Sequence, residues 1–113
     1  MPRFERGDVV RVPFPYTDRL AHEYRPALVV SHGGIGENQS LLWVVMITSA
    51  QNRPWPGDID CGSSHRDAGL PAPSVIRPGK IATIDAGRAK PLGKIRPALL
   101  ASVTVALKKQ LGL

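Results

Sequence analysis

Short apolar runs, each ended by glycine, proline or polar residues, set the pattern of this chain. Two of them, residues 26–31 and 41–47, consist mostly of aliphatic and β-branched side chains, as expected of strands that are buried on both faces. Shorter runs predict five further strands, at residues 9–12, 57–61, 74–77, 80–84 and 94–95. The pattern therefore favours a strand-rich fold.

Helical spacing of apolar side chains is convincing only near the C-terminus. Pro97 suits the first turn of a helix, and Lys108 and Lys109 suit its last turn. The apolar residues that share one face there are Leu99, Leu100, Val103, Ala106, Leu107 and Leu111. Eleven prolines and eleven glycines divide the rest of the chain into short pieces, including a break at Pro78 and Gly79. Together these features predict a small, mostly antiparallel barrel or half-barrel closed by a terminal helix.

Length and composition limit the class of protein. A chain of 113 residues suits one domain spanning residues 1–113, and an apolar fraction of 42% is typical of a soluble globular protein. The chain contains no apolar stretch long enough to span a membrane, and residues 1–6 lead into no signal-peptide core. Cys61 is the single cysteine, which fits a reducing compartment. We therefore expect a cytoplasmic protein without a membrane partner.

A net charge of +6 favours a polyanionic partner, with nucleic acid first. The alternative is a basic surface that only keeps the protein soluble. The basic residues are scattered along the chain, so folding would have to gather them before they formed a patch.

Several catalytic motifs are missing from the sequence. It has no Cys-x-x-Cys pair and no His-Glu-x-x-His motif, and its three histidines lack ligand spacing, so no metal site is expected. A phosphate-binding P-loop and a Gly-x-Ser-x-Gly elbow are also missing, and residues 33–36 read as a turn instead of a dinucleotide fingerprint. The sequence predicts no cofactor.

Polar residues at the ends of the two longest apolar runs form the strongest candidate site. Arg25 precedes one run, and Thr48 and Ser49 follow the other. If the two runs are neighbouring strands, a guanidinium and two hydroxyls converge at one sheet edge, where they suit the oxygens of a phosphodiester. The alternatives are a surface ion pair of Arg25 with a nearby carboxylate, Asp18 or Glu23, and a plain strand end.

RNA is the polymer that fits such a metal-free set, because its 2′-hydroxyl is a built-in nucleophile. The enzyme then has to position that group, assist proton transfer and stabilise charge on phosphorus. Arg77, His22 and Glu23 complete the candidates for these tasks.

An ordered series of motifs carries a family resemblance. The segments are Gly7-Asp8-Val9-Val10, residues 13–18, residues 25–31, Ile47-Thr48-Ser49, Trp55-Pro56-Gly57-Asp58, residues 69–77 and residues 80–85. In order and spacing this series resembles the MazF/PemK toxins of bacterial type II toxin–antitoxin systems, over nearly the whole chain.

The resemblance implies a compact SH3-like β-barrel, mainly β with a C-terminal helix, and usually a homodimer. It implies a metal-independent, sequence-specific endoribonuclease that cuts single-stranded RNA to 2′,3′-cyclic phosphate and 5′-hydroxyl ends, and that a cognate antitoxin neutralises. The family's catalytic arginine and threonine fall on Arg25 and Thr48, next to Ser49. The loop residues expected to contact RNA are Tyr16, Thr17, Asp18, Arg53 and Trp55.

The sequence departs from one branch of the family, which uses an arginine and an aspartate two residues later. Arg77 matches the arginine, but Gly79 occupies the aspartate position, so that acid–base pair does not carry over. Arg77 then either binds phosphate or only pairs on the surface, while His22 and Glu23 become the candidates for proton transfer. Trp55 either stacks on a base or packs against one end of the barrel.

Two other functions fit the same fold. One is a non-catalytic nucleic-acid-binding module, and the other is a gyrase-poisoning toxin that would need neither Arg25 nor Thr48.

Overall fold

A computed structural model of the chain describes residues 3–14 and 23–113. These residues form six strands, three short 3-10 helices and one α-helix. The strands are β1 (Asp8–Phe14), β2 (Glu23–Val29), β3 (Leu41–Ser49), β4 (Ile59–Asp60), β5 (Ser74–Asp85) and β6 (Lys90–Lys94). The helices are η1 (Glu37–Gln39), η2 (Gly62–His65), η3 (Ala86–Arg88) and α1 (Pro97–Leu111).

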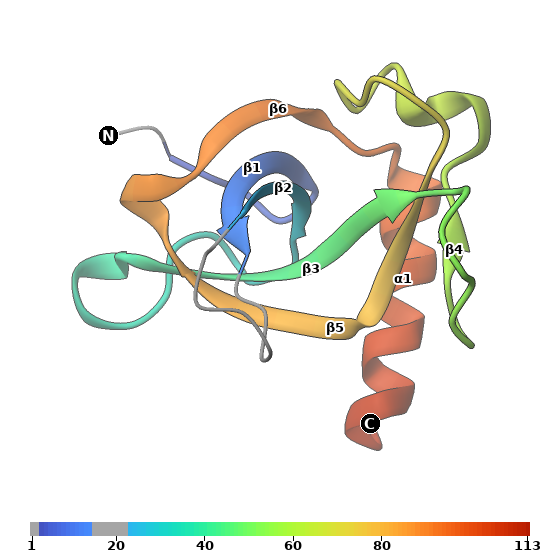
Figure 1. Cartoon of the computed structure of the whole chain (residues 1–113). Coiled ribbons are helices and arrows are strands. Elements are labelled where there is room, and N and C mark those ends of the chain that lie inside the picture. Colours follow the sequence, from blue (N-terminus) through green and yellow to red (C-terminus); the bar gives the residue numbers. More distant parts are fainter. Residues whose placement is uncertain (1–2, 15–22) are drawn as a thin grey trace.

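The six strands form one antiparallel sheet in the order β4-β5-β3-β2-β1-β6. Figure 1 shows this sheet curling so strongly that β3, β5 and β6 surround β1 and β2, with α1 beside the end of the sheet that carries β4. The architecture confirms the predicted half-barrel with a terminal helix.

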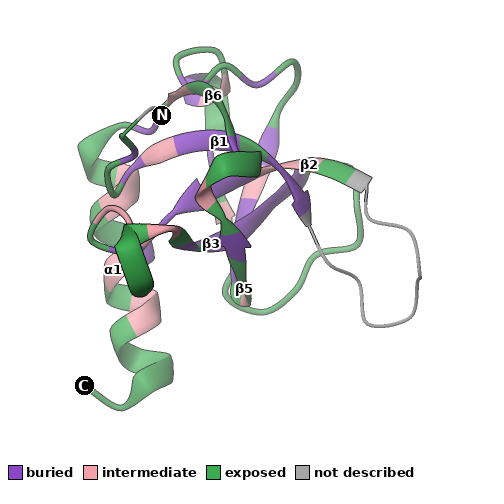
Figure 2. Ribbon diagram, turned by 90° about the vertical axis from the view of Figure 1, so that its left-hand side faces the viewer, coloured by how far each residue is buried: buried purple, intermediate pink, exposed green. Residues whose placement is uncertain are grey.

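Two apolar cores lie on the two faces of this curved sheet. The first, inside the curl, contains Val12, Ala27 and Met46, and the second contains Leu28, Val45 and Ile47 under the helix residue Val103. Neighbours along a strand belong to different cores because successive side chains point to opposite faces. Buried positions consequently run without a break over residues 27–29 of β2 and 44–48 of β3, whereas α1 buries only one side (Figure 2). Double burial explains why residues 44–47 lack polar alternation, whereas the apolar Leu41 and Trp43 are exposed.

Several strand boundaries differ from the sequence predictions. Residues 74–77 and 80–84 belong to the single strand β5, because Pro78 and Gly79 lie in a bulge: Val45 pairs with Ile81, and Met46 with Arg77. A bulge accommodates extra residues without ending a strand. The strands β1, β2 and β3 each extend beyond the apolar run, since a ladder needs backbone partners more than apolar side chains. The last strand is Lys90–Lys94 instead of residues 94–95.

The C-terminal helix matches its prediction. Pro97 occupies its first turn, and Gly112 ends it in a left-handed conformation whose N–H bonds back to the last turn. Leu99, Leu100 and Leu107 pack against the second core, while Leu111 is mostly exposed. No helix in the described ranges is long and apolar enough to cross a membrane.

Candidate functional site

Arg25 and Thr48 lie on neighbouring strands and share one face of the sheet. The pairing of β2 with β3 runs through Val29–Val44, Leu28–Val45 and Ala27–Met46. Continuing the same register by two residues brings Arg25 level with Thr48. Each lies two positions beyond a residue of the first core, so both side chains belong to that face at its polar end. The described ladder ends at Ala27 and Met46, so the structure makes the two strands neighbours, while the convergence of the Arg25 and Thr48 side chains stays a prediction.

The hydroxyl of Thr48 has a defined partner. Thr48 is 6% exposed, and its Oγ1 accepts a hydrogen bond of 2.5 Å from Nδ2 of Asn52. Asn52 is held in turn by a tight turn, in which its backbone N–H donates to the carbonyl oxygen of Ser49 at 3.1 Å. A threonine at a strand end would ordinarily be free to rotate its hydroxyl, and here the donor fixes it.

Ser49 serves the turn itself. Its Oγ accepts the backbone N–H of Gln51 at 3.2 Å, and its side chain is on the opposite face from that of Thr48 because the two residues are adjacent in β3. Ser49 therefore shapes the loop that carries Asn52.

Arg77 lies on the same face as Thr48 but directs its guanidinium into the loop at residues 50–58. It is opposite Met46 in the β3–β5 ladder and is 7% exposed. Nε and Nη2 of Arg77 donate to the two carboxylate oxygens of Asp58 at 3.0 Å each, and Nη2 also donates to the carbonyl oxygen of Arg53 at 3.0 Å. The sequence left two roles open for Arg77, phosphate binding and surface pairing. The structure adds a third role, in which the buried side chain braces the loop.

The ion pair also changes the acid–base properties of Asp58. The guanidinium of Arg77 hydrogen-bonds its carboxylate and lowers its pKa below the ordinary value, against the opposing effect of burial. Asp58 is consequently charged across the physiological range, as a fixed partner for a permanent cation.

Trp55 lies over these cations. Its ring centroid is 4.6 Å from Cζ of Arg77 and 5.7 Å from Nζ of Lys80, and its backbone N–H donates to Asp58. Trp55 is 41% exposed, and Arg53 in the same loop is also exposed. Trp55 packs on Arg77 and stays partly exposed, and its expected stacking on a base stays a prediction.

Several predicted site residues lie outside the described residues. These are Tyr16, Thr17, Asp18 and His22, while Glu23 begins β2 and its side chain is not described. The roles expected of these five residues stay predictions.

The sequence analysis missed Asn52 and Asp58 as parts of the site. Asp58 stands in a quoted motif, and its carboxylate could have been matched with a buried arginine only once the fold was known. Nothing in the sequence around Asn52 points to Thr48, because the contact depends on the turn between them.

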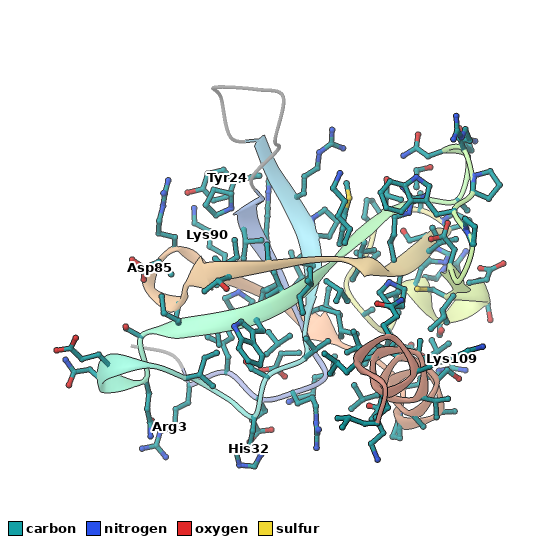
Figure 3. All side chains as sticks on the ribbon, turned by 90° about the horizontal axis from the view of Figure 1, so that it is seen from below. Arg3, Tyr24, His32, Asp85, Lys90 and Lys109 are labelled. Atoms are coloured by element: carbon teal, nitrogen blue, oxygen red, sulfur yellow. The ribbon has the colours of Figure 1, made fainter. Side chains whose placement is uncertain are left out.

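A second group of cations lies on the outer face of the sheet. Cζ of Arg11 and Nζ of Lys90 lie 6.0 and 5.8 Å from the ring centroid of Tyr24. Figure 3 shows Tyr24 and Lys90 side by side, well away from Lys109 on α1. Tyr24 precedes Arg25, so the two side chains point to opposite faces of β2. Basic residues therefore gather on both faces at this end of the sheet.

An apolar groove of about 560 Å³ separates α1 from the outer face of β3 and β5. Trp43 and Ile81 line its sheet side and are 50% and 53% exposed, while Leu107 and Leu111 line its helix side. Trp43 is therefore a surface residue of this groove and lies outside both apolar cores.

Comparisons with known proteins agree with the fold. MazF from Deinococcus radiodurans superposes with a TM-score of 0.75 at 22% identity, covering 100% of both chains. An endoribonuclease from a mycobacterial species superposes with a TM-score of 0.72 at 26% identity, covering 100% of this chain and 95% of that one. A mycobacterial endoribonuclease in complex with its cognate antitoxin gives 0.71 at 26% identity, covering 96% and 95% of the two chains.

A sequence comparison with curated proteins gives no match. Residues 5–111 match the family described as PemK-like, MazF-like toxin of type II toxin–antitoxin systems. The chain therefore belongs to the PemK/MazF toxin family.

Proposed function

We propose that this chain is an endoribonuclease that cuts single-stranded RNA without a metal ion and serves as the toxin of a type II toxin–antitoxin pair. The observation that carries the proposal is the pairing of β2 with β3, whose register, if continued by two residues, would bring Arg25 level with Thr48 on one face. The family match and the net charge of +6 support it.

In the proposed reaction, the 2′-hydroxyl of the RNA attacks the adjacent phosphorus. The bond from phosphorus to the 5′ oxygen of the next nucleotide breaks, leaving a 2′,3′-cyclic phosphate and a 5′-hydroxyl. One proton leaves the 2′-hydroxyl and one is added to the departing oxygen. Arg25 stabilises the extra negative charge on the phosphoryl oxygens, and the hydroxyl of Thr48 donates to one of them. His22 and Glu23 are the predicted groups for proton transfer.

The RNA would enter across the loop at residues 50–58. Arg53 and Trp55 are both exposed in this loop, and they would offer a cation and an aromatic face to a nucleotide. The loop around Tyr16, Thr17 and Asp18 is proposed for the other side.

A cognate antitoxin is the proposed protein partner. Structural neighbours include a mycobacterial endoribonuclease solved with its cognate antitoxin and a MazE–MazF complex from Deinococcus radiodurans. An acidic partner would complement the basic surface of this chain.

The chain is also proposed to be a homodimer, with the groove beside α1 as the contact. The half-exposed Trp43 and Ile81 on the sheet side, together with Leu111 on the helix side, give a self-association surface that a monomer would leave in water. Light scattering after size exclusion should give twice the chain mass for the wild type. The Trp43→Glu variant should give the mass of one chain. A variant that stays dimeric would show that the contact lies elsewhere.

The direct test of the function is cleavage of a long RNA in excess EDTA. Wild-type protein should cut it at defined positions, and Arg25→Ala and Thr48→Ala should lose activity. Arg88→Ala, which removes an exposed arginine on η3, should cut like the wild type, and Thr48→Ser should retain much of the activity because it keeps a hydroxyl. Unaltered cutting by both alanine variants would contradict the site. No cutting by folded, dimeric wild type would contradict the activity and favour a binding module or a gyrase poison.

A further inference from the structure

The hydrogen bond between Asn52 and Thr48 has a direction with chemical consequences. Nδ2 of Asn52 is the donor and Oγ1 of Thr48 the acceptor. A hydroxyl has one proton and two lone pairs, so a hydroxyl that accepts from an amide keeps its own proton for another acceptor. The donor therefore orients Thr48 as a donor toward the face it shares with Arg25.

We propose that Asn52 is a positioning residue for the cleavage reaction, holding the Thr48 hydroxyl so that its proton points at a phosphoryl oxygen of the RNA. The proposal rests on the proposed function and adds a residue that acts only through Thr48. Preorganised donors are effective because they need no reorientation when charge develops on the phosphate. If the Thr48 hydroxyl donated to a protein acceptor instead, it would have to break that hydrogen bond before it could donate to the phosphate.

The position of Asn52 is fixed from two sides. On one side, the turn closes through the bond from its own N–H to Ser49 and the bond from Gln51 to the Ser49 hydroxyl. On the other side, the carbonyl oxygen of the next residue, Arg53, accepts a hydrogen bond from Arg77, which forms an ion pair with Asp58.

Both the arginine and the aspartate of this anchor are nearly buried, with side chains 8% and 10% exposed. A buried, bidentate pair holds its geometry better than an exposed one, which exchanges with water. Arg77 thus contributes to the site through the loop, as a brace for Asn52.

The test substitutes Asn52→Asp, which keeps the shape and replaces a donor by an acceptor. The Thr48 hydroxyl would then donate to the new carboxylate and lose its proton for RNA. We expect kcat on a mapped RNA site to fall by about tenfold to a hundredfold, with KM changed by less than about twofold. The matched control is Asn38→Asp, which makes the same charge change at the opposite end of β3 and should leave both constants as in the wild type.

A double-mutant cycle separates positioning from a general structural effect. If Asn52 acts only through the hydroxyl, Asn52→Asp should have no further effect in the Thr48→Val background. Undiminished kcat in Asn52→Asp, or equal losses in both backgrounds, would overturn the proposal.

A spectroscopic measurement tests the contact without RNA. In a ¹⁵N–¹H spectrum, one side-chain amide proton of Asn52 should move upfield in Thr48→Val, because it loses its acceptor. Unchanged amide protons would overturn the assigned direction of the bond. If wild type cuts no RNA, the proposed function falls and the positioning role falls with it. If wild type cuts and Asn52→Asp cuts equally well, only the positioning role falls.

Discussion

Arg77 and Asp58 form a two-point ion pair between the bulged strand β5 and the loop that follows β3, with both hydrogen bonds at 3.0 Å. Arg96 and Asp67 form a second arginine–aspartate pair at the surface, with side chains 58% and 56% exposed. The two pairs have the same chemistry and opposite burial. They therefore allow the contribution of the buried brace to be measured against an internal reference.

Asp58→Ala should lower the free energy of unfolding by about 3 to 5 kcal/mol, because it leaves the buried guanidinium without its charge partner. Asp67→Ala should lower it by no more than about 1 kcal/mol, since water replaces the lost partner of the exposed Arg96. Urea titrations of both variants measure the difference. Equal losses in the two variants would show that the buried pair has no special role.

The same pair predicts a dependence of stability on acid. The folded-state pKa of Asp58 is lowered, so its contribution is complete above the unfolded value of about 3.9 and is lost as the pH falls through the lower folded value. The difference in unfolding free energy between wild type and Asp58→Ala should be constant from about pH 7 to pH 5 and should shrink in stronger acid. A difference that grows in acid would contradict the assigned shift.

The close approach of the backbone at Gly69 to β6 predicts that a larger residue there is destabilising. Its φ is +75°, and a Cβ there would lie 2.1 Å from the carbonyl oxygen of Leu92 on β6, whereas at Gly57, with φ of +87°, a Cβ would meet nothing within 4 Å. Gly57→Ala should cost about 1 to 2 kcal/mol from backbone strain alone. Gly69→Ala should cost a further 1 to 3 kcal/mol or so, because the loop must move away from β6. Equal melting temperatures for the two variants would contradict the close approach.

The strands at the centre of the sheet could be predicted because double burial leaves a clear signal. Residues 26–30 and 41–47 are apolar throughout, and they fall mostly in the neighbouring strands β2 and β3. The bulge at Pro78 and Gly79 could not be distinguished from a chain break, since proline and glycine mark both.

The site could be predicted only in part, for a related reason. Arg25 and Thr48 flank apolar runs, and these runs lie in strands that the structure pairs with each other. Their supporting residues depend on loop geometry: Asn52 reaches Thr48 across a turn, and Asp58 reaches Arg77 from 19 residues away in sequence. Periodicity carries no information about such contacts.

The claim that RNA supplies its own nucleophile has the most direct test. Once a cleavage position is mapped, a short RNA carrying a single 2′-deoxy nucleotide on the 5′ side of that bond removes the attacking hydroxyl and nothing else. Incubated with the wild type in EDTA, this substrate should be bound within about twofold of the all-RNA control, since one 2′-hydroxyl contributes little to binding dominated by phosphates, and it should not be cut at that position. Cleavage of the 2′-deoxy substrate at the same bond would contradict attack by the 2′-hydroxyl.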